Sequence, residues 1–223
     1  MESSKHIVVF SHGFGVRKDS RGLFSDIAAA LPGVEPVMFD YNEIDDAKNT
    51  VTVRPLAQQS EMLRGVLREI KESAPNAVID LICHSQGSIV ASLAMPTGIR
   101  KTVFLAPPVN INSNRMLEAF RSRPGSEINM EGISKIARRD GSTTIVPSEF
   151  WAERKNLRPL ELYGEFAHHT NLAIIKANQD EVLEEVSFQG LGSSVEVVSL
   201  SGDHNFTGNA RGPLLEVIKK LLI

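Results

Sequence analysis

The chain has 223 residues, 42% of them hydrophobic and 23% charged, a composition that suits a single globular domain. Its formal net charge of −3, with acidic and basic residues interspersed, gives no reason to expect binding to nucleic acid or to an anionic membrane. The single cysteine, Cys83, excludes an intramolecular disulfide and a cysteine-based zinc site. No stretch resembles a signal peptide or approaches the length of a membrane span, which favours a cytoplasmic protein.

Strand and helix patterns alternate along the first third of the chain. Residues 6–10 are an apolar run that predicts a first buried strand, and residues 21–31 have apolar side chains at helical spacing. A second strand is expected over residues 36–40. A long amphipathic helix is expected from about residue 55 to residue 75, because Pro55 suits the first turn of a helix.

The same alternation continues to the end of the chain. The run 77–83 predicts a third strand, and residues 86–95 predict a helix that ends before Pro96. Further strands are expected at 101–106, 172–177 and 195–200, and further helices at 179–186 and 212–223. Strands that are apolar almost throughout and alternate with helices are typical of an α/β fold, with a mostly parallel sheet covered by helices on both faces.

One segment, residues 107–170, interrupts this alternation. It contains charged, helix-like pieces and a turn-rich stretch, and it is too long for a simple loop in a compact domain. We therefore expect residues 1–223 to form one domain in which residues 107–170 are an inserted cap over one edge of the sheet.

Three side chains suited to nucleophilic catalysis stand at the carboxyl ends of predicted strands. Ser85 follows the third strand, Asp180 the fifth and His204 the sixth. In an open parallel sheet ligands bind beyond these ends, so the three are expected to meet. A serine hydroxyl needs a base to take its proton, a role that suits His204, and Asp180 would orient the imidazole ring.

The order Ser, Asp, His, the strand–turn–helix pattern around Ser85 and the sequence HGFG after the first strand together resemble the alpha/beta-hydrolase fold. The nucleophile of that family usually stands in Gly-x-Ser-x-Gly. Here Cys83, also a small residue, replaces the first glycine, and Gly87 is retained. The stretches HGF, CHSQGSIVASLA and VFLAPPVN further resemble the bacterial feruloyl or cinnamoyl esterase branch, whose members carry an inserted cap.

The resemblance implies roles for the site residues. Ser85 would be the nucleophile, Asp180 the acid and His204 the base, and the backbone N–H groups of Phe14 and Gln86 would form the oxyanion hole. It also implies a serine hydrolase that cleaves carboxylic esters through an acyl-enzyme, with small aryl or short-acyl esters as substrates. No cofactor and no metal are expected, and the only partner expected is a small-molecule ester.

Alternatives remain for several of these residues. Ser85 and Asp180 could each simply cap the helix that follows, and Glu181 and Asp203 compete with Asp180 for the role of the acid. Among the other histidines, His12 is expected to brace the loop after the first strand and His84 to pack near the turn. In the cap, Phe150 and Trp151 could line an acyl pocket or form the core of the cap.

Two other functions also fit the sequence. A thioesterase or a lipase-like acylhydrolase would use the same three residues. A non-catalytic binding module could keep the fold with an inactive site, although the presence of all three residues argues against it.

Overall fold

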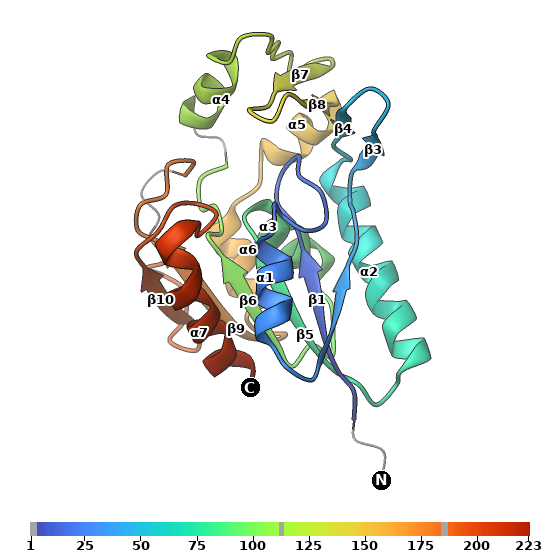
Figure 1. Cartoon of the computed structure of the whole chain (residues 1–223), viewed down its shortest axis with the longest axis vertical. Helices are drawn as coiled ribbons and strands as arrows, with labels where there is room; N and C mark the ends of the chain where they lie inside the picture. The colour runs from blue at the N-terminus through green and yellow to red at the C-terminus, as the bar shows by residue number, and fades with distance from the viewer. Residues whose placement is uncertain (1–3, 112–113, 184–186) are drawn as a thin grey trace.

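The computed structural model describes residues 4–111, 114–183 and 187–223 (Figure 1). Six strands form a main sheet in which every pair of neighbours is parallel. Its order is β10–β9–β6–β5–β1–β2. The strands are β1 (His6–Ser11), β2 (Val34–Met38), β5 (Val78–His84), β6 (Lys101–Leu105), β9 (Asn171–Ala177) and β10 (Glu196–Leu200).

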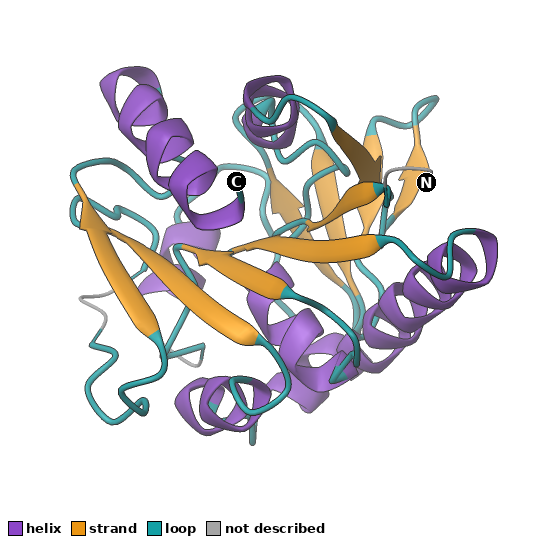
Figure 2. Cartoon of the chain, turned by 90° about the horizontal axis from the view of Figure 1, so that it is seen from below, coloured by secondary structure: helices purple, strands orange, loops and turns teal. Residues whose placement is uncertain are grey.

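Helices cover both faces of this sheet (Figure 2). Side chains alternate between the two faces of a strand, so Val8 and Phe10 of β1 pack into one hydrophobic cluster while Ile7 and Val9 pack into another. The first cluster includes α1 (Leu23–Ala30) and α7 (Arg211–Leu222), and the second includes α2 (Leu56–Ser73), α3 (Gln86–Ala94) and α6 (Pro159–Phe166). Burial on both faces explains why the strands are apolar almost throughout.

A second, four-stranded sheet lies above the carboxyl ends of the main strands in Figure 1. Its order is β3–β4–β8–β7, and β4 and β8 pair in parallel although about ninety residues separate them in the chain. Its strands are β3 (Glu43–Asp45), β4 (Thr50–Thr52), β7 (Ser134–Ala137) and β8 (Thr143–Val146). With α4 (Asn114–Arg121) and α5 (Ser148–Arg154) it forms the upper part of the molecule.

The predicted parallel sheet with helices on both faces is confirmed. Each predicted main strand lies within two residues of the observed one, and the long helix begins at Leu56. The helix predicted over 179–186 is wrong for its described residues, 179–183, which form a turn and a bend. There the Asp180 carboxylate accepts the backbone N–H groups of Val182 and Leu183 and so closes a turn; residues 184–186 lie outside the described residues.

The upper part draws on more of the chain than residues 107–170. Strands β3 and β4, which the sequence did not predict, pair with the 107–170 segment through β8. Conversely, α6 belongs to that segment, but its Tyr163 and Phe166 pack against Phe104 of the main sheet, with ring centroids 5.2 and 5.4 Å away. The end of the segment thus contributes to the main core.

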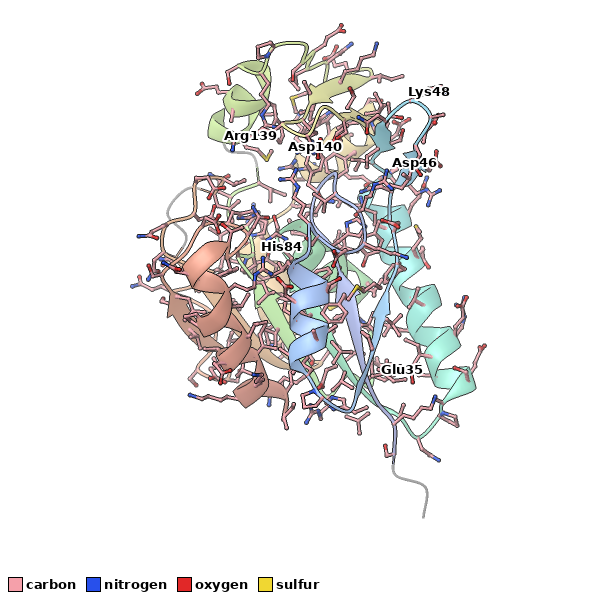
Figure 3. All side chains as sticks on the ribbon, viewed as in Figure 1. Glu35, Asp46, Lys48, His84, Arg139 and Asp140 are labelled. Carbon is pink, nitrogen blue, oxygen red and sulfur yellow. The ribbon has the colours of Figure 1, made fainter. Side chains whose placement is uncertain are left out.

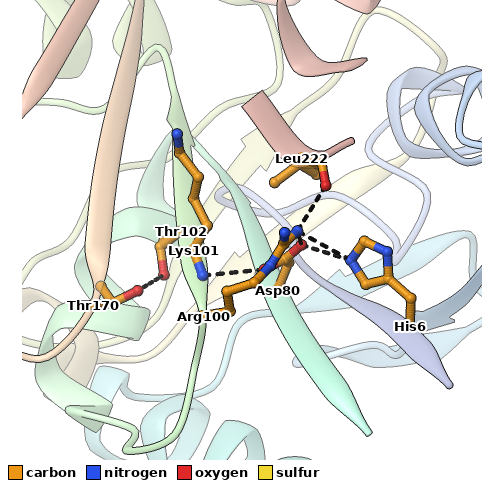
Figure 4. A network of polar contacts seen from close by, with 7 residues as sticks. All are labelled: His6, Asp80, Arg100, Lys101, Thr102, Thr170 and Leu222. Carbon is orange, nitrogen blue, oxygen red and sulfur yellow. Dashed lines mark hydrogen bonds and ion pairs between the residues drawn. The ribbon is translucent and has the colours of Figure 1, made fainter. Parts of the chain in front are cut away.

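A buried carboxylate ties the amino-terminal edge of the main sheet together (Figure 4). Asp80 of β5 is fully buried and lies 2.7 Å from the Nε2 of His6 on β1. It also accepts hydrogen bonds from the Arg100 side chain, at 2.9 Å to Nε, and from the Lys101 backbone N–H. Arg100 in turn donates to the Leu222 carbonyl at the end of α7. This network lies near the amino-terminal ends of the strands, whereas Ser85 lies at their carboxyl ends.

Candidate active site

Ser85 occupies the turn between β5 and α3 in a strained conformation. Its backbone φ is 53° and its ψ −121°, outside the regions that a residue with a side chain normally adopts. A hydrogen bond from its backbone N–H to the Leu105 carbonyl, 2.9 Å long, holds the turn in place. The Ser85 side chain makes no capping hydrogen bond to α3, so the alternative in which it serves only as a helix cap lacks its defining contact.

The structure brings Ser85, His204 and Asp180 into one hydrogen-bonded chain. The Ser85 Oγ lies 2.9 Å from the Nε2 of His204, and the Nδ1 of His204 lies 2.6 Å from the Oδ2 of Asp180. The carboxylate accepts the Nδ1–H, so Nε2 is left as the acceptor of the serine proton. The His204 and Asp180 side chains are each only 7% exposed, so these hydrogen bonds are shielded from water.

Asp180 is held as a carboxylate. Burial alone would raise its pKa, but the hydrogen bond from His204 and the backbone N–H groups of Leu183 and Val182 bring the pKa below its ordinary value. The rival acids make other contacts. Glu181 accepts the backbone N–H of His204 at 3.0 Å, and Asp203 accepts the backbone N–H and hydroxyl of Thr207.

His84 supports His204 from the other side. Its Nε2 donates to the His204 backbone carbonyl at 3.0 Å, and its Nδ1 accepts the Ser20 hydroxyl at 3.1 Å. Burial, together with the nearby His204, lowers the pKa of His84 to about 3, so the ring is neutral and can donate from Nε2 while accepting at Nδ1. The sequence placed His84 near the turn, but not in contact with residue 204.

The loop after β1 approaches Ser85 closely. A Cβ built on Gly13 would lie 3.3 Å from the Cβ of Ser85. Among the described residues, no hydrogen bond uses the backbone N–H of Phe14 or of Gln86, the two predicted oxyanion donors. The side chain of Gln86 is engaged elsewhere, since its Nε2 donates to the Oε1 of Gln59 at 3.1 Å. These two amides therefore remain available beside the serine, as an oxyanion hole requires.

His12 braces this loop. Its Nε2 accepts the backbone N–H of Tyr41 and its Nδ1 donates to the Gly13 carbonyl, each at 2.9 Å. Burial lowers the pKa of His12, which keeps the ring neutral as this pair of bonds demands. The ring thus links the loop to the segment that follows β2.

A cavity of about 290 Å³ opens beside Ser85. Ser85, His204, Phe14 and Gln86 line it together with apolar side chains from the upper part of the molecule, such as Ile111, Met116 and Phe120. Five arginines also line it: Arg21, Arg123, Arg138, Arg139 and Arg154. The sequence alone did not single out these arginines, because they come from four separate segments and only Arg138 and Arg139 are neighbours in the chain.

Of the two alternatives left open for Phe150 and Trp151, the contacts favour the core over the pocket wall. Both are buried, and neither is among the described residues that line the cavity. Their rings lie behind Phe14, with centroids 5.3 and 6.3 Å from its own, and the indole Nε1 of Trp151 donates to the Ser134 Oγ at 3.1 Å. Both side chains are thus packed against the loop that carries Phe14.

In residues 4–111, 114–183 and 187–223, no three His, Cys, Asp or Glu side chains are placed to hold a metal ion. No helix in the same part of the chain is both long enough and apolar enough to cross a bilayer.

Comparison with solved structures finds close likenesses over the whole chain. The chain is similar to Est1E from Butyrivibrio proteoclasticus, with a TM-score of 0.70, 17% identity, and coverage of 99% of this chain and 87% of Est1E. It is also similar to the esterase domain of a Rhodothermus marinus protein, with a TM-score of 0.67, 16% identity and coverage of 98% and 87%. An alpha-beta serine hydrolase homologue from Coxiella burnetii matches with a TM-score of 0.62, 17% identity and coverage of 100% and 87%.

The chain has the alpha/beta-hydrolase fold. A family model described as alpha/beta hydrolase matches residues 36–109, a stretch that includes Ser85 and ends just after β6. No curated protein sequence matches the chain. The predicted alpha/beta-hydrolase fold is confirmed, and the chain is similar in structure to Est1E, which has also been solved with ferulic acid bound. Several of the other similar structures are described as esterases or lipolytic enzymes.

Proposed function

We propose that the protein is a serine hydrolase that cleaves carboxylic esters through an acyl-enzyme. The observation that carries this proposal is the hydrogen-bonded chain from Ser85 through His204 to Asp180, at 2.9 and 2.6 Å. A nucleophile within reach of a base, itself oriented by a buried carboxylate, is the arrangement that acyl transfer needs. A binding module with an inactive site would have no need to keep this chain intact.

In the acylation step, the Ser85 Oγ attacks the ester carbonyl carbon while its proton passes to the Nε2 of His204. Asp180 stabilises the resulting imidazolium through the Nδ1–H bond. The carbonyl oxygen becomes an oxyanion, which accepts hydrogen bonds from the backbone N–H groups of Phe14 and Gln86. One such donor typically lowers the barrier by about 3 kcal/mol. The imidazolium then protonates the leaving alcohol as the C–O bond breaks.

Deacylation reverses the roles. Water attacks the Ser85 ester, His204 takes the proton of the water, and the second tetrahedral species collapses to release the carboxylic acid. His204 then returns its proton to the Ser85 Oγ. Besides the ester, this cycle uses only residues of the protein and one water molecule.

The substrates we propose are small aryl or short-acyl esters. A cavity of about 290 Å³ lies at the lower end of the range for small-molecule sites, which suits a short acyl chain or a single ring. The likeness to Est1E, for which a structure with ferulic acid exists, supports an aryl group.

We further propose that the chain is one domain in which residues 107–170 serve as a cap over the site, with α6 at the end of the segment packed onto the main sheet. Ile111, Met116 and Phe120 from this segment line the cavity above Ser85, so the segment can shield the site from water and limit the size of the acyl group. Strands β3 and β4 anchor the cap to the rest of the chain through β8.

The test is an activity panel with 4-nitrophenyl esters of increasing acyl length, methyl ferulate and an acyl-CoA thioester. We expect turnover of short 4-nitrophenyl esters with a pre-steady-state burst, and its loss in Ser85→Ala, since loss of such a nucleophile typically costs about 10⁴-fold or more. Ser88→Ala, at the next serine along the chain, is the matched control. Hydrolysis of the thioester alone would assign a thioesterase, and no turnover of any substrate would refute the proposal.

A further inference from the structure

The cavity beside Ser85 is strongly positive. Among the described residues, five arginines line it against a single carboxylate, that of Glu181. Within the described residues, none of these arginines has a carboxylate oxygen within 4.0 Å. The protein as a whole carries a net charge of −3, so this concentration of positive charge is local to the site.

Arg154 is the most buried of the five, with 7% of its surface exposed. Its guanidinium donates to the Ile111 carbonyl and lies 5.5 Å from the ring centroids of both Phe150 and Trp151. Burial lowers the pKa of Arg154 to about 10, which still leaves the group charged at neutral pH. A buried charge without a counter-ion is costly, and a bound anion would remove that cost.

Arg138 and Arg123 form a second positive group. The Arg138 guanidinium lies 5.4 Å from the centroid of the Phe14 ring, and both arginines lie over the ring of Phe120, at 5.8 and 5.2 Å. The Nε of Arg138 donates to the Thr144 Oγ1, but its Nη2 is buried and has no partner among the described residues. Burial, followed by repulsion from Arg123 and from Arg21, lowers the pKa of Arg138 to about 10.

Asp140, two residues after Arg138, does little to neutralise this group. Figure 3 labels Asp140 and Arg139 together, above His84. The Oδ1 of Asp140 accepts the backbone N–H and the hydroxyl of Ser142, and the carboxylate makes no ion pair within 4.0 Å in the described part of the chain. Arginine is the side chain best suited to bind carboxylate, sulfate or phosphate oxygens, because its planar fork can donate two parallel hydrogen bonds.

We propose that the substrate is an anionic ester, which carries a carboxylate, sulfate or phosphate group that the arginines of this cavity bind while Ser85 attacks the ester carbonyl. This inference rests on the proposed esterase function and narrows its substrate class. The same positive charge would draw anionic substrates toward the site and raise the rate of their association.

The first experiment compares esters that differ in charge and share their size. Mono-4-nitrophenyl glutarate and 4-nitrophenyl pentanoate release the same phenolate from acyl groups of five carbons, and only the first is anionic. Two further arms place the charge in the leaving group: 4-sulfophenyl against phenyl pentanoate, and pentanoyl-CoA against a neutral pentanoyl thioester. We expect kcat/KM to favour the anionic member about tenfold or more in at least one arm, with the preference falling as salt is added.

The second experiment removes the charges. Arg138→Met, Arg154→Met and the more exposed Arg123→Met should each lower the anionic-to-neutral ratio of kcat/KM, with the largest loss, of about tenfold, for Arg138 and Arg154. Arg68→Met, on the exposed face of α2, is the matched control and should leave the ratio unchanged. If a buried arginine variant fails to fold, Arg123→Met still gives the comparison.

A binding measurement separates this inference from the esterase proposal. Ser85→Ala, which cannot turn over, is titrated calorimetrically with glutarate and with the neutral glutaramide, with and without Arg138→Met. Binding of glutarate that the arginine variant weakens supports the anion site even if no ester is hydrolysed. A ratio near 1 in all three kinetic arms, or equal binding of glutarate and glutaramide, would overturn the inference.

Discussion

Gly87→Ala is expected to damage both the active site and the fold, although alanine is the better helix former. Gly87 lies in the first turn of α3, two residues after Ser85, where the helix crosses the end of β1. A Cβ at this position would lie 2.1 Å from the Ser11 carbonyl oxygen and 2.8 Å from the Ser11 Oγ. Real Cβ atoms essentially never approach another heavy atom within 3.0 Å, so the helix and the strand would have to separate by about 1 Å.

The magnitude follows from two opposing terms. Overpacking of a core by a methyl group costs about 1–3 kcal/mol, while replacing glycine by alanine in a helix gains about 1 kcal/mol. We therefore expect a net loss of up to about 2 kcal/mol in the free energy of unfolding. Because the loop with Gly13 and Phe14 directly follows Ser11, the same shift moves the oxyanion donors away from Ser85. A displacement of about 1 Å can cost about 100-fold in rate.

The assay combines kcat/KM for 4-nitrophenyl acetate with urea unfolding followed by circular dichroism. Gly65→Ala in α2 is the matched control, since the nearest atom to its built Cβ, the Nη2 of Arg68, is 4.0 Å away. That variant should gain about 0.5–1 kcal/mol and keep its activity. If Gly87→Ala also gained stability and kept wild-type turnover, the close approach of α3 to β1 would be wrong.

Three further changes probe other parts of the structure. Asp180→Asn should lower kcat about 10⁴-fold with little change in unfolding, because the amide cannot hold the His204 tautomer; turnover near the wild-type rate would rule out Asp180 as the acid. His84 has a depressed pKa of about 3 when folded, so the unfolded state takes up its proton first, and stability should fall as pH decreases from about 6.5 to 3. His84→Gln should reduce that fall in unfolding measured at several pH values and the exposed His169→Gln should not, whereas equal acid sensitivity would contradict the assignment. Asp80→Ala should lower the free energy of unfolding by about 2–4 kcal/mol in denaturant, between the values for exposed and buried ion pairs. Turnover per folded molecule should not change. A loss of turnover would mean that Asp80 lies nearer the site than the structure shows.

The main sheet was predictable because its signal is local. Each strand is an apolar run that ends at a turn, so its position follows from a few neighbouring residues. The residues proposed as the triad were predictable for a related reason, since a parallel sheet places the carboxyl ends of its strands along one edge. Three polar residues that follow three strands must then lie near one another.

The second sheet and the charge of the cavity were not predictable in this way. Strands β3 and β4 are short and polar, and β4 is paired with β8 from a distant part of the chain, so no local pattern marks them. The bend after Asp180 was predicted as a helix. An aspartate can cap the start of a helix or close a turn with its side chain, and the sequence is alike in the two cases. Likewise, nothing in the sequence around Phe150 and Trp151 distinguishes aromatic residues that line a pocket from aromatic residues packed in the core behind it.

The central claim is that Ser85 is the nucleophile of an acyl-transfer site. Its most direct test is to treat the protein with a labelled fluorophosphonate and to locate the label by peptide mass spectrometry. A nucleophile activated by His204 should be modified on the Ser85 Oγ at one label per chain, with labelling abolished in Ser85→Ala and strongly reduced in His204→Ala. The control variant Ser88→Ala should be labelled at Ser85 as the wild-type protein is. Absence of label at Ser85 in the folded wild-type protein, or label that persists in Ser85→Ala, would contradict the account.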